Sequence, residues 1–599
     1  MKPLQKLNTY IKKCKGKFIL GALFLTASNF FLIWIPVLIR RTMDEVEALG
    51  GEYSQAYSSI IEILFSSEAG EILAYNSLLL IGTVALYGIL LFATRQTLIV
   101  GSRHVEFDIR NRVLDKLLTL PQRYFESNKS GEVYVRATED ISRVREYFGP
   151  VVMYTINTLT RAGFIITMMI IVNPELTMWA LLPLPFLSGF AYWVSGYINK
   201  YQTIIQEKYS DIAGTAQEAF SSIRLIKAFN REEYKQKIFE KESESYRVKK
   251  LRLDLVESLF HPALNMLIGV SVVIVIWQGG MMVINDTITI GNIAEFVIYV
   301  AYLTWPVASL GYTVNTFQKS LASWKRVDKV LTEPVQISDV EDSELLNKKV
   351  EGAIEFVDVN FQYPGAEEKA INNVSFKIEK GTTAAFVGRT GSGKTTLVNL
   401  IPRLFDTTSG EIKVDGLDVK KWSTSALRRG IGYVPQETFL FSTTVKENIA
   451  FGVENATMKQ IESAAEKANV LQNILEFEKK FETIVGERGI TLSGGQKQRT
   501  AIARALIKDP SIIILDDSLS AVDTKTEDAI LGHLRERRSG NTTIMISHSI
   551  STVKNANIIF YLENGSIVEQ GSHEDLLSLE GRYARMYQKQ LLEEQLAQI

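Results

Sequence analysis

Six long apolar segments dominate the first half of the sequence, at about residues 18–39, 77–96, 148–172, 176–198, 261–284 and 290–312. A helix needs about 20 mostly apolar residues to cross the hydrocarbon core of a bilayer, and each segment is about that long. A signal peptide would account for the first segment, but five more follow it. The sequence therefore predicts that residues 1–330 form an all-α membrane domain with six transmembrane helices.

The charges around the first segment predict its orientation. Six lysines and no acidic residue precede the segment, whereas the loop after it contains two arginines and seven acids. Because lysine-rich flanks stay in the cytoplasm, we expect the N-terminus inside, and six crossings return the chain to that side. We therefore expect a multi-pass protein of the cell (inner) membrane, with its N-terminus and everything after about residue 320 in the cytoplasm.

Two long connections between the apolar segments, residues 96–147 and 199–260, are charged and have heptad-like apolar spacing. This spacing predicts helices that continue well past the membrane and end in short turns. The overall composition gives two further limits. The 66 basic and 67 acidic side chains leave a net charge of −1, so no basic excess supports a nucleic-acid partner. The single cysteine excludes an internal disulfide framework and fits a reducing cytoplasm.

The periodicity of the sequence changes after the mixed-charge linker at residues 331–350. Alternating strands follow, and the buried strand "TTAAFVG" leads directly into "GRTGSGKTT". Residues 388–395 match the phosphate-loop pattern G-x-x-x-x-G-K-[ST] in its required strand–loop–helix setting. Backbone N–H groups of such a loop surround a phosphate, and the next helix points its positive end at it. We therefore expect an α/β P-loop ATPase domain over residues 351–599.

A second stretch, "LSGGQKQRTAIARALI", places a glycine pair at the start of an amphipathic helix. This is another helix N-terminus suited to an anion, about a hundred residues after the first. A single nucleotide cannot easily use both helix starts within one compact domain. The two stretches therefore predict that ATP is held between two such domains.

Six motifs in this order resemble those of the ATP-binding cassette (ABC) exporters, in the half-transporter form with six transmembrane helices fused to one nucleotide-binding domain. They are "GRTGSGKT", "VPQETFLF", "LSGGQ", "ILDD", "SAVD" and "ISH". The resemblance covers nearly the whole chain. It implies an ABC helical subdomain within the ATPase domain, ATP and Mg²⁺ as cofactors, and a second half-transporter as the partner.

The resemblance also implies roles for individual residues. The ATP-binding set is Tyr363, Gly388, Arg389, Thr390, Gly391, Ser392, Gly393, Lys394, Thr395 and Thr396. Within this set Tyr363 would stack on adenine and Lys394 would reach the β- and γ-phosphates. The Mg²⁺ set is Thr395, Gln436 and Asp516, and the catalytic set is Asp517, His548 and Gln436.

Two further segments would serve the dimer. The signature residues Leu492, Ser493, Gly494, Gly495 and Gln496 would bind the ATP that the partner subunit holds. The D-loop residues Ser520, Ala521, Val522 and Asp523 would lie at the dimer seam. Segments at about residues 125–130 and 215–222 resemble the coupling helices of the inner loops, and "VGERG" at residues 485–489 resembles the segment that reports to them.

Asp517 departs from the family pattern, because the members that hydrolyse ATP well usually have Glu at this position. The shorter carboxylate ends about 1 Å or more from where a base must reach, and a misplacement of this size can cost ~10²-fold in rate. In one interpretation this chain is the degenerate half of a heterodimer, and its intact "LSGGQ" completes the partner's competent site. In the other it forms a homodimer in which Asp517 works with His548. We favour the heterodimer.

The resemblance implies export of a hydrophobic or amphipathic small molecule, drug-like or lipid, across the lipid bilayer. Polar residues inside the apolar segments are candidates for contact with this cargo, although such residues often tie helices together. They are Asn29, Asn157, Arg161, Asn265, Gln278 and Glu295. An ATP-gated channel or a regulatory membrane ATPase remains the alternative on the same fold.

Overall fold

The computed structural model describes residues 15–53, 68–337, 348–486, 489–536 and 541–597, together with residues 6, 7, 9, 10 and 12. The chain divides into two compact units. The first combines Met1–Leu118 with Ser130–Glu333, and the second combines Thr119–Lys129 with Pro334–Ile599. Residues 338–347 of the predicted linker lie outside the described residues.

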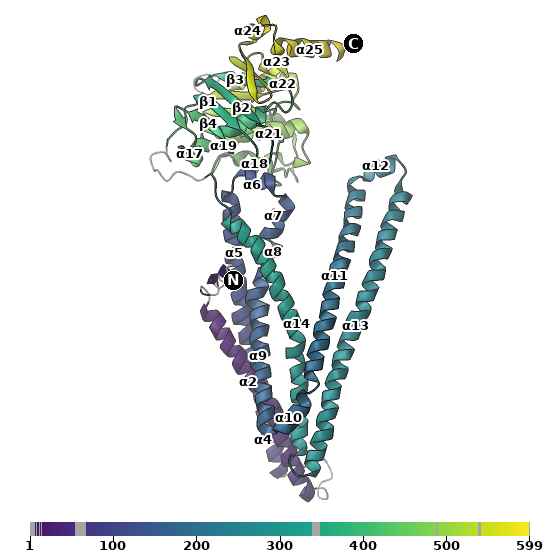
Figure 1. Cartoon of the computed structure of the whole chain (residues 1–599). Helices are drawn as coiled ribbons and strands as arrows, with labels where there is room; N and C mark the ends of the chain where they lie inside the picture. The colour runs from purple at the N-terminus through teal and green to yellow at the C-terminus, as the bar shows by residue number, and fades with distance from the viewer. Residues whose placement is uncertain are drawn as a thin grey trace. The chain divides into compact units, whose positions relative to one another are not determined.

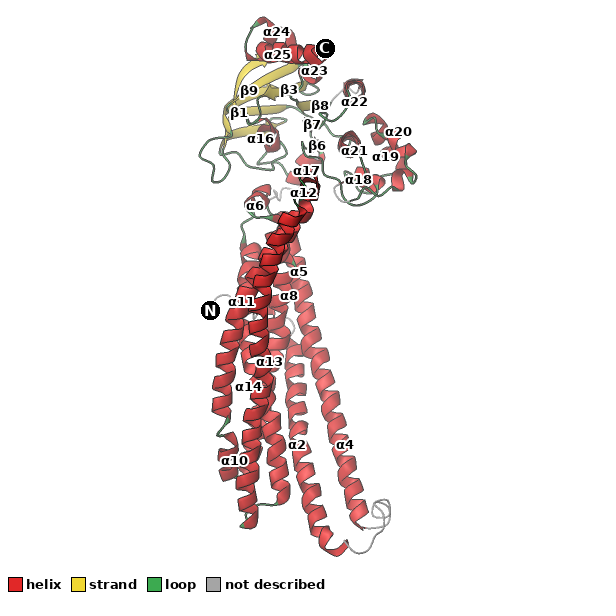
Figure 2. Ribbon diagram, turned by 90° about the vertical axis from the view of Figure 1, so that its right-hand side faces the viewer, coloured by secondary structure: helices red, strands yellow, loops and turns green. Residues whose placement is uncertain are grey.

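The first unit is helical (Figures 1 and 2). Its described α-helices are α2 (Lys15–Tyr53), α4 (Glu68–Thr94), α5 (Val100–Thr119), α7 (Ser130–Ala137), α8 (Glu139–Glu146), α9 (Val152–Val172), α10 (Pro174–Leu181), α11 (Leu184–Ser221), α12 (Ile223–Ala228), α13 (Glu232–Ile284) and α14 (Ile290–Thr332). Two π-helical turns, η1 (Arg95–Ile99) and η2 (Tyr147–Val151), join α4 to α5 and α8 to α9.

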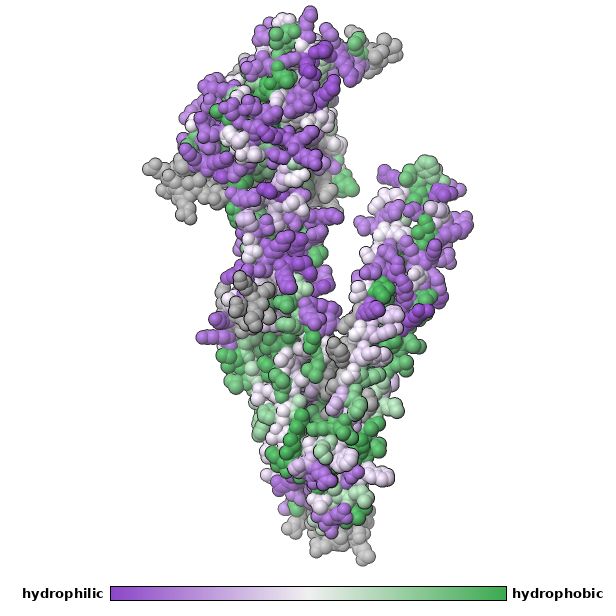
Figure 3. Space-filling view, viewed as in Figure 1, coloured by the Kyte–Doolittle hydropathy of each residue, from purple (hydrophilic) through white to green (hydrophobic). Residues whose placement is uncertain are grey.

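Four helical stretches of the described chain are long and apolar enough to cross a membrane: Lys15–Ala48, Gly70–Thr119, Ser130–Val172 and Ile290–Thr332. A shorter apolar stretch, Ile268–Ile284, lies in α13. In the predicted fourth span, residues 176–198, α10 ends at Leu181 and α11 begins at Leu184, just after Pro183. Apolar side chains gather over the lower part of the helical unit in Figure 3. The prediction of six transmembrane helices is therefore neither confirmed nor contradicted by the described residues.

The helices continue well past the predicted spans, as the heptad-like spacing predicted. The 38 residues of α11 and the 53 residues of α13 extend about 57 Å and 80 Å at 1.5 Å per residue, against a hydrocarbon core of about 30 Å. These two helices form an arm that leans away from α5, α8 and α14 toward its tip, where α12 joins them (Figure 1).

The structure corrects the prediction of a separate coupling helix at residues 215–222. Residues 215–221 form the last two turns of α11, Ser222 lies between the helices, and the short helix at the tip of the arm is α12, Ile223–Ala228. In the first hairpin, the short helix is α6 (Gln122–Ser127), which overlaps the predicted residues 125–130. Pro121 precedes α6, and Asn128 leaves the helix in an extended conformation.

Polar pairs join the helices of the first unit, so the helix-tying role holds for several of the polar residues singled out above. Asn29 on α2 donates hydrogen bonds to Asn157 (2.9 Å) and Thr160 (2.7 Å) on α9. Glu295 on α14 is fully buried and forms an ion pair with Arg40 on α2 at 3.1 Å. In an apolar surrounding each such group needs a partner, and these bonds fix α2 against α9 and α14.

The second unit contains two sheets. The four-stranded sheet has the order β2-β1-β4-β5 and the six-stranded sheet the order β10-β9-β3-β8-β7-β6. The strands are β1 (Ile354–Phe361), β2 (Ile371–Ile378), β3 (Thr383–Gly388), β4 (Ser409–Val414), β5 (Leu417–Asp418), β6 (Ile431–Val434), β7 (Ile512–Asp516), β8 (Thr542–Ile546), β9 (Ile558–Glu563) and β10 (Ser566–Gly571). A helical domain followed by an α/β domain confirms the predicted fold class.

Helices surround these sheets (Figure 2). They are α16 (Lys394–Leu400), α17 (Thr424–Arg429), α18 (Val445–Ala450), α19 (Met458–Lys467), α20 (Leu471–Glu476), α21 (Gly494–Leu506), α22 (Thr524–Glu536), α23 (Ile550–Val553), α24 (His573–Ser578) and α25 (Arg582–Ala597), with a 3₁₀ turn at Lys480–Glu482. Helices α18 to α21 lie together beside the six-stranded sheet, as expected for a helical subdomain.

The centre of the six-stranded sheet is parallel and buried on both faces. In β7, Ile513 and Leu515 pack into the core on one face, whereas Ile512 and Ile514 pack into the core on the other. This alternation explains why the strand is an unbroken apolar run. Since β3, β6, β7 and β8 are mutually parallel neighbours, their carboxyl ends meet at one edge of the sheet, where such folds bind ligands.

Candidate nucleotide-binding site

The phosphate loop connects β3 to α16 and depends on glycines. Gly388 has φ +147° and Gly393 has φ +99°, a region that side chains with a Cβ rarely adopt. A Cβ on Gly388 would lie 2.3 Å from the carbonyl oxygen of Leu562, and one on Gly393 would lie 2.5 Å from that of Ala370. The sequence motif therefore forms the tight strand–loop–helix turn that it predicts.

Lys394 begins α16 and folds back over this loop. Its Nζ donates to the carbonyl oxygens of Gly388 and Arg389, both at 2.9 Å. The side chain is 6 % exposed, and burial lowers the pKa of its ammonium group. The nearby carboxylates of Asp516 and Asp517 act in the opposite direction and favour the charged form.

Asp516 ends β7 and brings a buried carboxylate to the site. The residue is 1 % exposed, and its Oδ1 accepts a hydrogen bond from Thr395 Oγ1 at 3.1 Å. Its Oδ2 is buried and has no hydrogen-bond partner among the described residues. Burial raises the pKa of Asp516 to about 6, the Asp517 charge adds to this shift, and the Thr395 bond and Lys394 oppose it.

The free carboxylate oxygen of Asp516 and the hydroxyl of Thr395 fit a magnesium ion. Mg²⁺ prefers hard oxygen ligands and is commonly held by one or two carboxylates together with phosphate oxygens. An unpaired carboxylate oxygen beside a phosphate loop meets this requirement. Thr395 and Asp516, from the predicted Mg²⁺ set, are therefore placed to hold the ion, and Gln436 lines the same cavity.

Asp517 follows at the turn after β7, in the left-handed region with φ +47°. Its backbone N–H donates to the carbonyl oxygen of Ile546 at 2.9 Å, and its Oδ2 is 3.5 Å from the donating Nε2 of Gln436. Asp tolerates this backbone region better than most residues with a side chain. The carboxylate is thus placed beside Gln436 at the carboxyl ends of β6 and β7.

A cavity of about 280 Å³ brings most of the predicted ATP-binding and catalytic residues together. Its walls include Tyr363, Thr390, Gly391, Gly393, Lys394, Thr395, Thr396, Gln436, Asp516, Asp517 and His548. Gly388 and Arg389 line a neighbouring cavity, together with Thr390 and His548. Tyr363 is held at the rim by a 3.1 Å hydrogen bond to Thr396 and by edge-on contact with Phe405.

The signature and D-loop residues lie outside the walls of this cavity. Ser493 caps α21 in a reciprocal pair with Gln496: its Oγ accepts from the Gln496 N–H, and its own N–H donates to Gln496 Oε1 at 3.0 Å. The D-loop packs on this helix start, since a Cβ on Gly495 would lie 2.9 Å from the carbonyl oxygen of Ala521. Within "VGERG", residues 487 and 488 lie outside the described residues.

Gln498, which sequence reasoning missed, joins these two segments. Its Oε1 accepts from the Ala521 N–H at 3.0 Å, and its Nε2 donates to Ser520 Oγ at 3.3 Å. Ser520 Oγ in turn donates to the carbonyl oxygen of Asp517 at 2.9 Å. A continuous chain of hydrogen bonds therefore runs from the backbone of Asp517 to the signature helix α21.

Arg504 was also missed, and it holds the loop after Gln436 against the same helix. Its guanidinium donates to the carbonyl oxygens of Phe439 (2.8 Å) and Asn448 (2.9 Å) and to Asn448 Oδ1 (2.7 Å). Burial lowers the pKa of Arg504 to about 10. Asn448 is fully buried and also accepts from the Phe441 N–H at 2.9 Å. An arginine among the apolar residues of an amphipathic helix is the one signal that the sequence offers.

Comparisons with known proteins agree with this architecture. The family model of the ABC transporter transmembrane region matches residues 18–307, and the ABC transporter model matches residues 371–520. A probable multidrug resistance ABC transporter ATP-binding/permease protein of Bacillus subtilis is 32% identical over 98% of this chain and 98% of its own. An ATP-dependent lipid A-core flippase of Aromatoleum aromaticum is 33% identical over 81% of this chain and 80% of its own.

A solved structure is also similar over the whole length. The structure of a bacterial Atm1-family ABC exporter with ATP bound has a TM-score of 0.75 and 25% sequence identity to this chain. The alignment covers 97% of this chain and 99% of that one.

Replacing Asp516 with Asn is expected to stabilise the metal-free protein while weakening Mg²⁺ binding. The folded-state pKa of about 6 lies above the ordinary 3.8, so the folded protein favours the neutral carboxyl and loses stability as pH rises through about 6. Asn imitates that neutral form. The melting temperature of D516N without Mg²⁺ should exceed that of the wild type near pH 8, and the difference should shrink below about pH 6.

The control for this prediction is Asp528→Asn, which neutralises an exposed carboxylate on α22. The melting temperature of D528N should equal that of the wild type at each pH at which D516N is compared. In the wild type, the apparent affinity for Mg²⁺-ATP should fall as pH drops through about 6, because a proton then competes for the Asp516 carboxylate. An unchanged melting temperature and unchanged Mg²⁺ dependence in D516N would contradict this account.

Replacing Arg504 with Met is expected to release the loop after Gln436. The substitution leaves the carbonyl oxygen of Phe439 and the buried side chain of Asn448 without their guanidinium partner, which should cost about 1–3 kcal/mol in the free energy of unfolding. Melting temperature and ATPase rate of the full chain should both fall. The control is Arg499→Met on the same helix, where the guanidinium binds the carbonyl oxygen of Asn469 instead. Equal effects of the two variants would refute the assignment.

Proposed function

The chain belongs to the ABC transporter family, and we propose that it exports a hydrophobic or amphipathic small molecule, drug-like or lipid, by alternating access. Its transmembrane region and its ATPase domain are fused in one polypeptide. The chain is a transport ATPase of the multidrug and lipid exporter type. The observation that carries the proposal is the cavity at the carboxyl ends of the parallel strands, where phosphate loop, buried carboxylate and His548 meet.

In this proposal the described residues divide the work of binding and hydrolysing ATP. Lys394 turns from the loop carbonyl oxygens to the β- and γ-phosphates, and Tyr363 stacks on the adenine. Thr395 and Asp516 would hold Mg²⁺, which would neutralise phosphate charge when bound. Asp517 and Gln436 orient the attacking water, and His548 contacts the γ-phosphate.

We further propose that a second half-transporter completes the protein. The signature and D-loop residues do not line this chain's own cavity, which supports a role at the nucleotide of a partner. The tip of the arm formed by α11, α12 and α13 also supports a partner. Phe220 is 76 % exposed, Leu225 60 % and Phe229 69 %, and several exposed apolar residues at one end of an arm favour burial against another protein.

The partner is proposed to be a different half-transporter. The Asp517 carboxylate lies at the limit of hydrogen-bond distance from Gln436, 3.5 Å, and it is one methylene shorter than the usual Glu. A heterodimer would pair this weak site with a competent one, to which this chain contributes an intact signature. The remaining catalytic residues of this chain line the cavity, so a homodimer with slow hydrolysis is the alternative.

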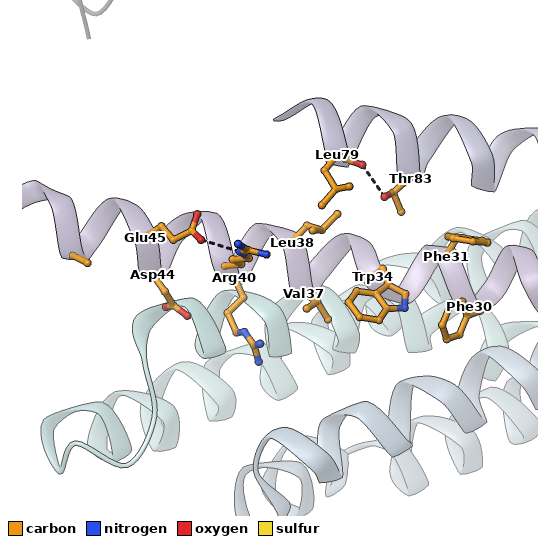
Figure 4. Close-up of a pocket in the computed structure, with 12 residues that line it drawn as sticks. Phe30, Phe31, Trp34, Val37, Leu38, Arg40, Asp44, Glu45, Leu79 and Thr83 are labelled. Carbon is orange, nitrogen blue, oxygen red and sulfur yellow. Dashed lines mark hydrogen bonds and ion pairs between the residues drawn. The ribbon is translucent and has the colours of Figure 1, made fainter. Parts of the chain in front are cut away.

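A cavity in the membrane domain supports an amphipathic cargo. It has a volume of about 700 Å³, within the range of small-molecule sites, and lies along α2 beside α4 (Figure 4). Phe30, Phe31 and Trp34 form one end of it, and Glu45, which forms an ion pair with Arg41, lies toward the other. An apolar body with a polar head matches this distribution of side chains.

Helix α6 supports a route for coupling. Residues Thr119–Lys129, which include α6, belong to the compact unit of the ATPase domain, whereas the residues on both sides belong to the helical unit. We propose that α6 and the tip of the arm transmit closure of the ATPase domains to the membrane helices. The N-terminus and the ATPase domain are then cytoplasmic, in a protein of the cell (inner) membrane.

The ATPase rate of the chain purified alone in lipid tests the preferred heterodimer. We expect slow hydrolysis by the wild type and an increase of up to ~10²-fold in kcat for Asp517→Glu, because the longer side chain returns the carboxylate to its working distance. A co-expressed partner half should also restore hydrolysis. Robust wild-type hydrolysis that His548→Ala abolishes would instead establish the homodimer.

Transport into inside-out vesicles tests export against the alternative of an ATP-gated channel. An amphipathic fluorescent dye should accumulate against its gradient only with Mg²⁺-ATP, because a transporter couples hydrolysis to movement whereas a channel lets its solute equilibrate. Lys394→Ala, which removes the phosphate-binding ammonium group, is the matched control and should abolish accumulation. ATP-dependent equilibration without accumulation would favour the channel.

A further inference from the structure

We propose that Gln590, on the C-terminal helix α25, is a positioning residue that holds His548 in its working place. The inference rests on the proposed contact of His548 with the γ-phosphate. It adds a residue from outside the motifs quoted above, 42 positions after the histidine that it holds.

The side-chain amide of Gln590 binds the loop after β8 on both sides of Ser549. Its Nε2 donates to the carbonyl oxygen of His548, and its Oε1 accepts from the Ile550 N–H at 2.9 Å. Ile550 is the first residue of α23, and the side chain of Ser549, the residue before it, makes no capping hydrogen bond. Gln590 therefore takes the place of a helix cap and fixes the backbone of His548 at the same time.

His548 lies between two cavities. One is the nucleotide cavity, and the other, of about 510 Å³, is lined by residues of the phosphate loop and of α25. Arg389 contributes from the loop, and Lys589 and Gln590 contribute from the helix. The C-terminal helix thus borders the phosphate site through the histidine (α23 and α25 lie close together in Figures 1 and 2).

Hydrogen bonds fix the first turn of α25 and therefore the position of Gln590 along this helix. The carboxylate of Glu569 on β10 accepts from the N–H groups of Arg582 (2.5 Å) and Tyr583 (3.0 Å), as a negative charge at a helix N-terminus favours. Tyr583 is fully buried, and its hydroxyl is 2.7 Å from His573 Nδ1. Gln590 lies two turns further along this anchored helix.

Such support matters in a site whose other catalytic side chain is short. Displacement of a catalytic group by about 1 Å can cost ~10²-fold in rate. With Asp517 in place of Glu, hydrolysis at this site depends more strongly on the remaining groups, of which His548 is one. The amide of Gln590 restrains the backbone of His548 without contacting the nucleotide cavity itself.

The test is a double-mutant cycle in the full-length chain in lipid, carried out in the Asp517→Glu background so that hydrolysis is measurable. Gln590→Leu is expected to lower kcat at least ~10-fold and to change KM for ATP by less than about threefold. His548→Ala should lower kcat further. The double variant Q590L/H548A should be no slower than H548A alone, because a residue that acts through His548 has nothing left to position.

A binding measurement checks the same cycle without catalysis. His548 distinguishes a nucleotide with a γ-phosphate from one without, so the ratio of affinities for AMP-PNP and ADP should fall in both Q590L and H548A. Gln590→Glu retains the acceptor for the Ile550 N–H but loses the donor to the His548 carbonyl oxygen. Its affinity ratio should lie between those of the parent and Q590L. Lys589→Ala, on the same helix and in the same cavity, should match the parent.

The melting temperatures of all variants distinguish a local effect on the site from unfolding of the protein. If Q590L is unstable, Q590E replaces it in the comparison. If H548A has full activity and an unchanged affinity ratio, the proposed function of His548 fails, whatever Gln590 does. If H548A is impaired but Q590L and Q590E match the parent, the inference about Gln590 is overturned. Losses that multiply in Q590L/H548A would also overturn it, because Gln590 would then act elsewhere.

Discussion

The buried carboxylate of Asp516 is the constraint on which the phosphate site depends. An apolar strand, β7, delivers it to the edge of the sheet, where one oxygen is bonded to Thr395 and the other has no partner among the described residues. Burying a carboxylate is unfavourable unless a positive charge compensates it, and Lys394 is drawn back to the carbonyl oxygens of its own loop. The folded site therefore carries an electrostatic cost that a bound Mg²⁺ with a phosphate ligand would relieve, so binding of the ion would stabilise the folded site.

Two independent connections lead from the phosphate site to the signature helix α21. One passes from the backbone of Asp517 through Ser520 to Gln498, and the other passes from the loop after Gln436 through Arg504. Both end on the same helix, whose N-terminal residues do not line this chain's own cavity. A displacement at the nucleotide would therefore reach α21 through two separate sets of hydrogen bonds. In the proposed dimer, this arrangement would let one subunit's nucleotide influence the site that its signature completes in the partner.

The sequence was most informative where a local pattern carries its own geometry. The phosphate loop after β3 and the helix that begins at the glycine pair of "LSGGQ" follow from a few adjacent residues, and the structure forms both elements as predicted. Partners distant in the chain could not be predicted, because nothing near Arg504 or Gln590 indicates that Phe439 or His548 will face it. The tip of the arm was misplaced for a related reason: residues 215–222 are as helical as those before them, and the break at Ser222 leaves no signal in the apolar periodicity.

The backbone at Asp517 gives a physical reason for the residue found there. At φ +47° a β-carbon is strained, and Asp is among the few residues that relieve this strain with local hydrogen bonds. A Glu carboxylate would reach further toward an attacking water, but Glu relieves less of the backbone strain at this turn than Asp does. The position therefore opposes backbone stability to the reach of the catalytic carboxylate. A homodimer would carry the short side chain at both of its sites. A heterodimer would carry it once, and the competent site of the partner would lose nothing, because this chain supplies that site through α21 and not through Asp517. In the proposed heterodimer, the loss of hydrolysis at one site only would make the shorter acid tolerable.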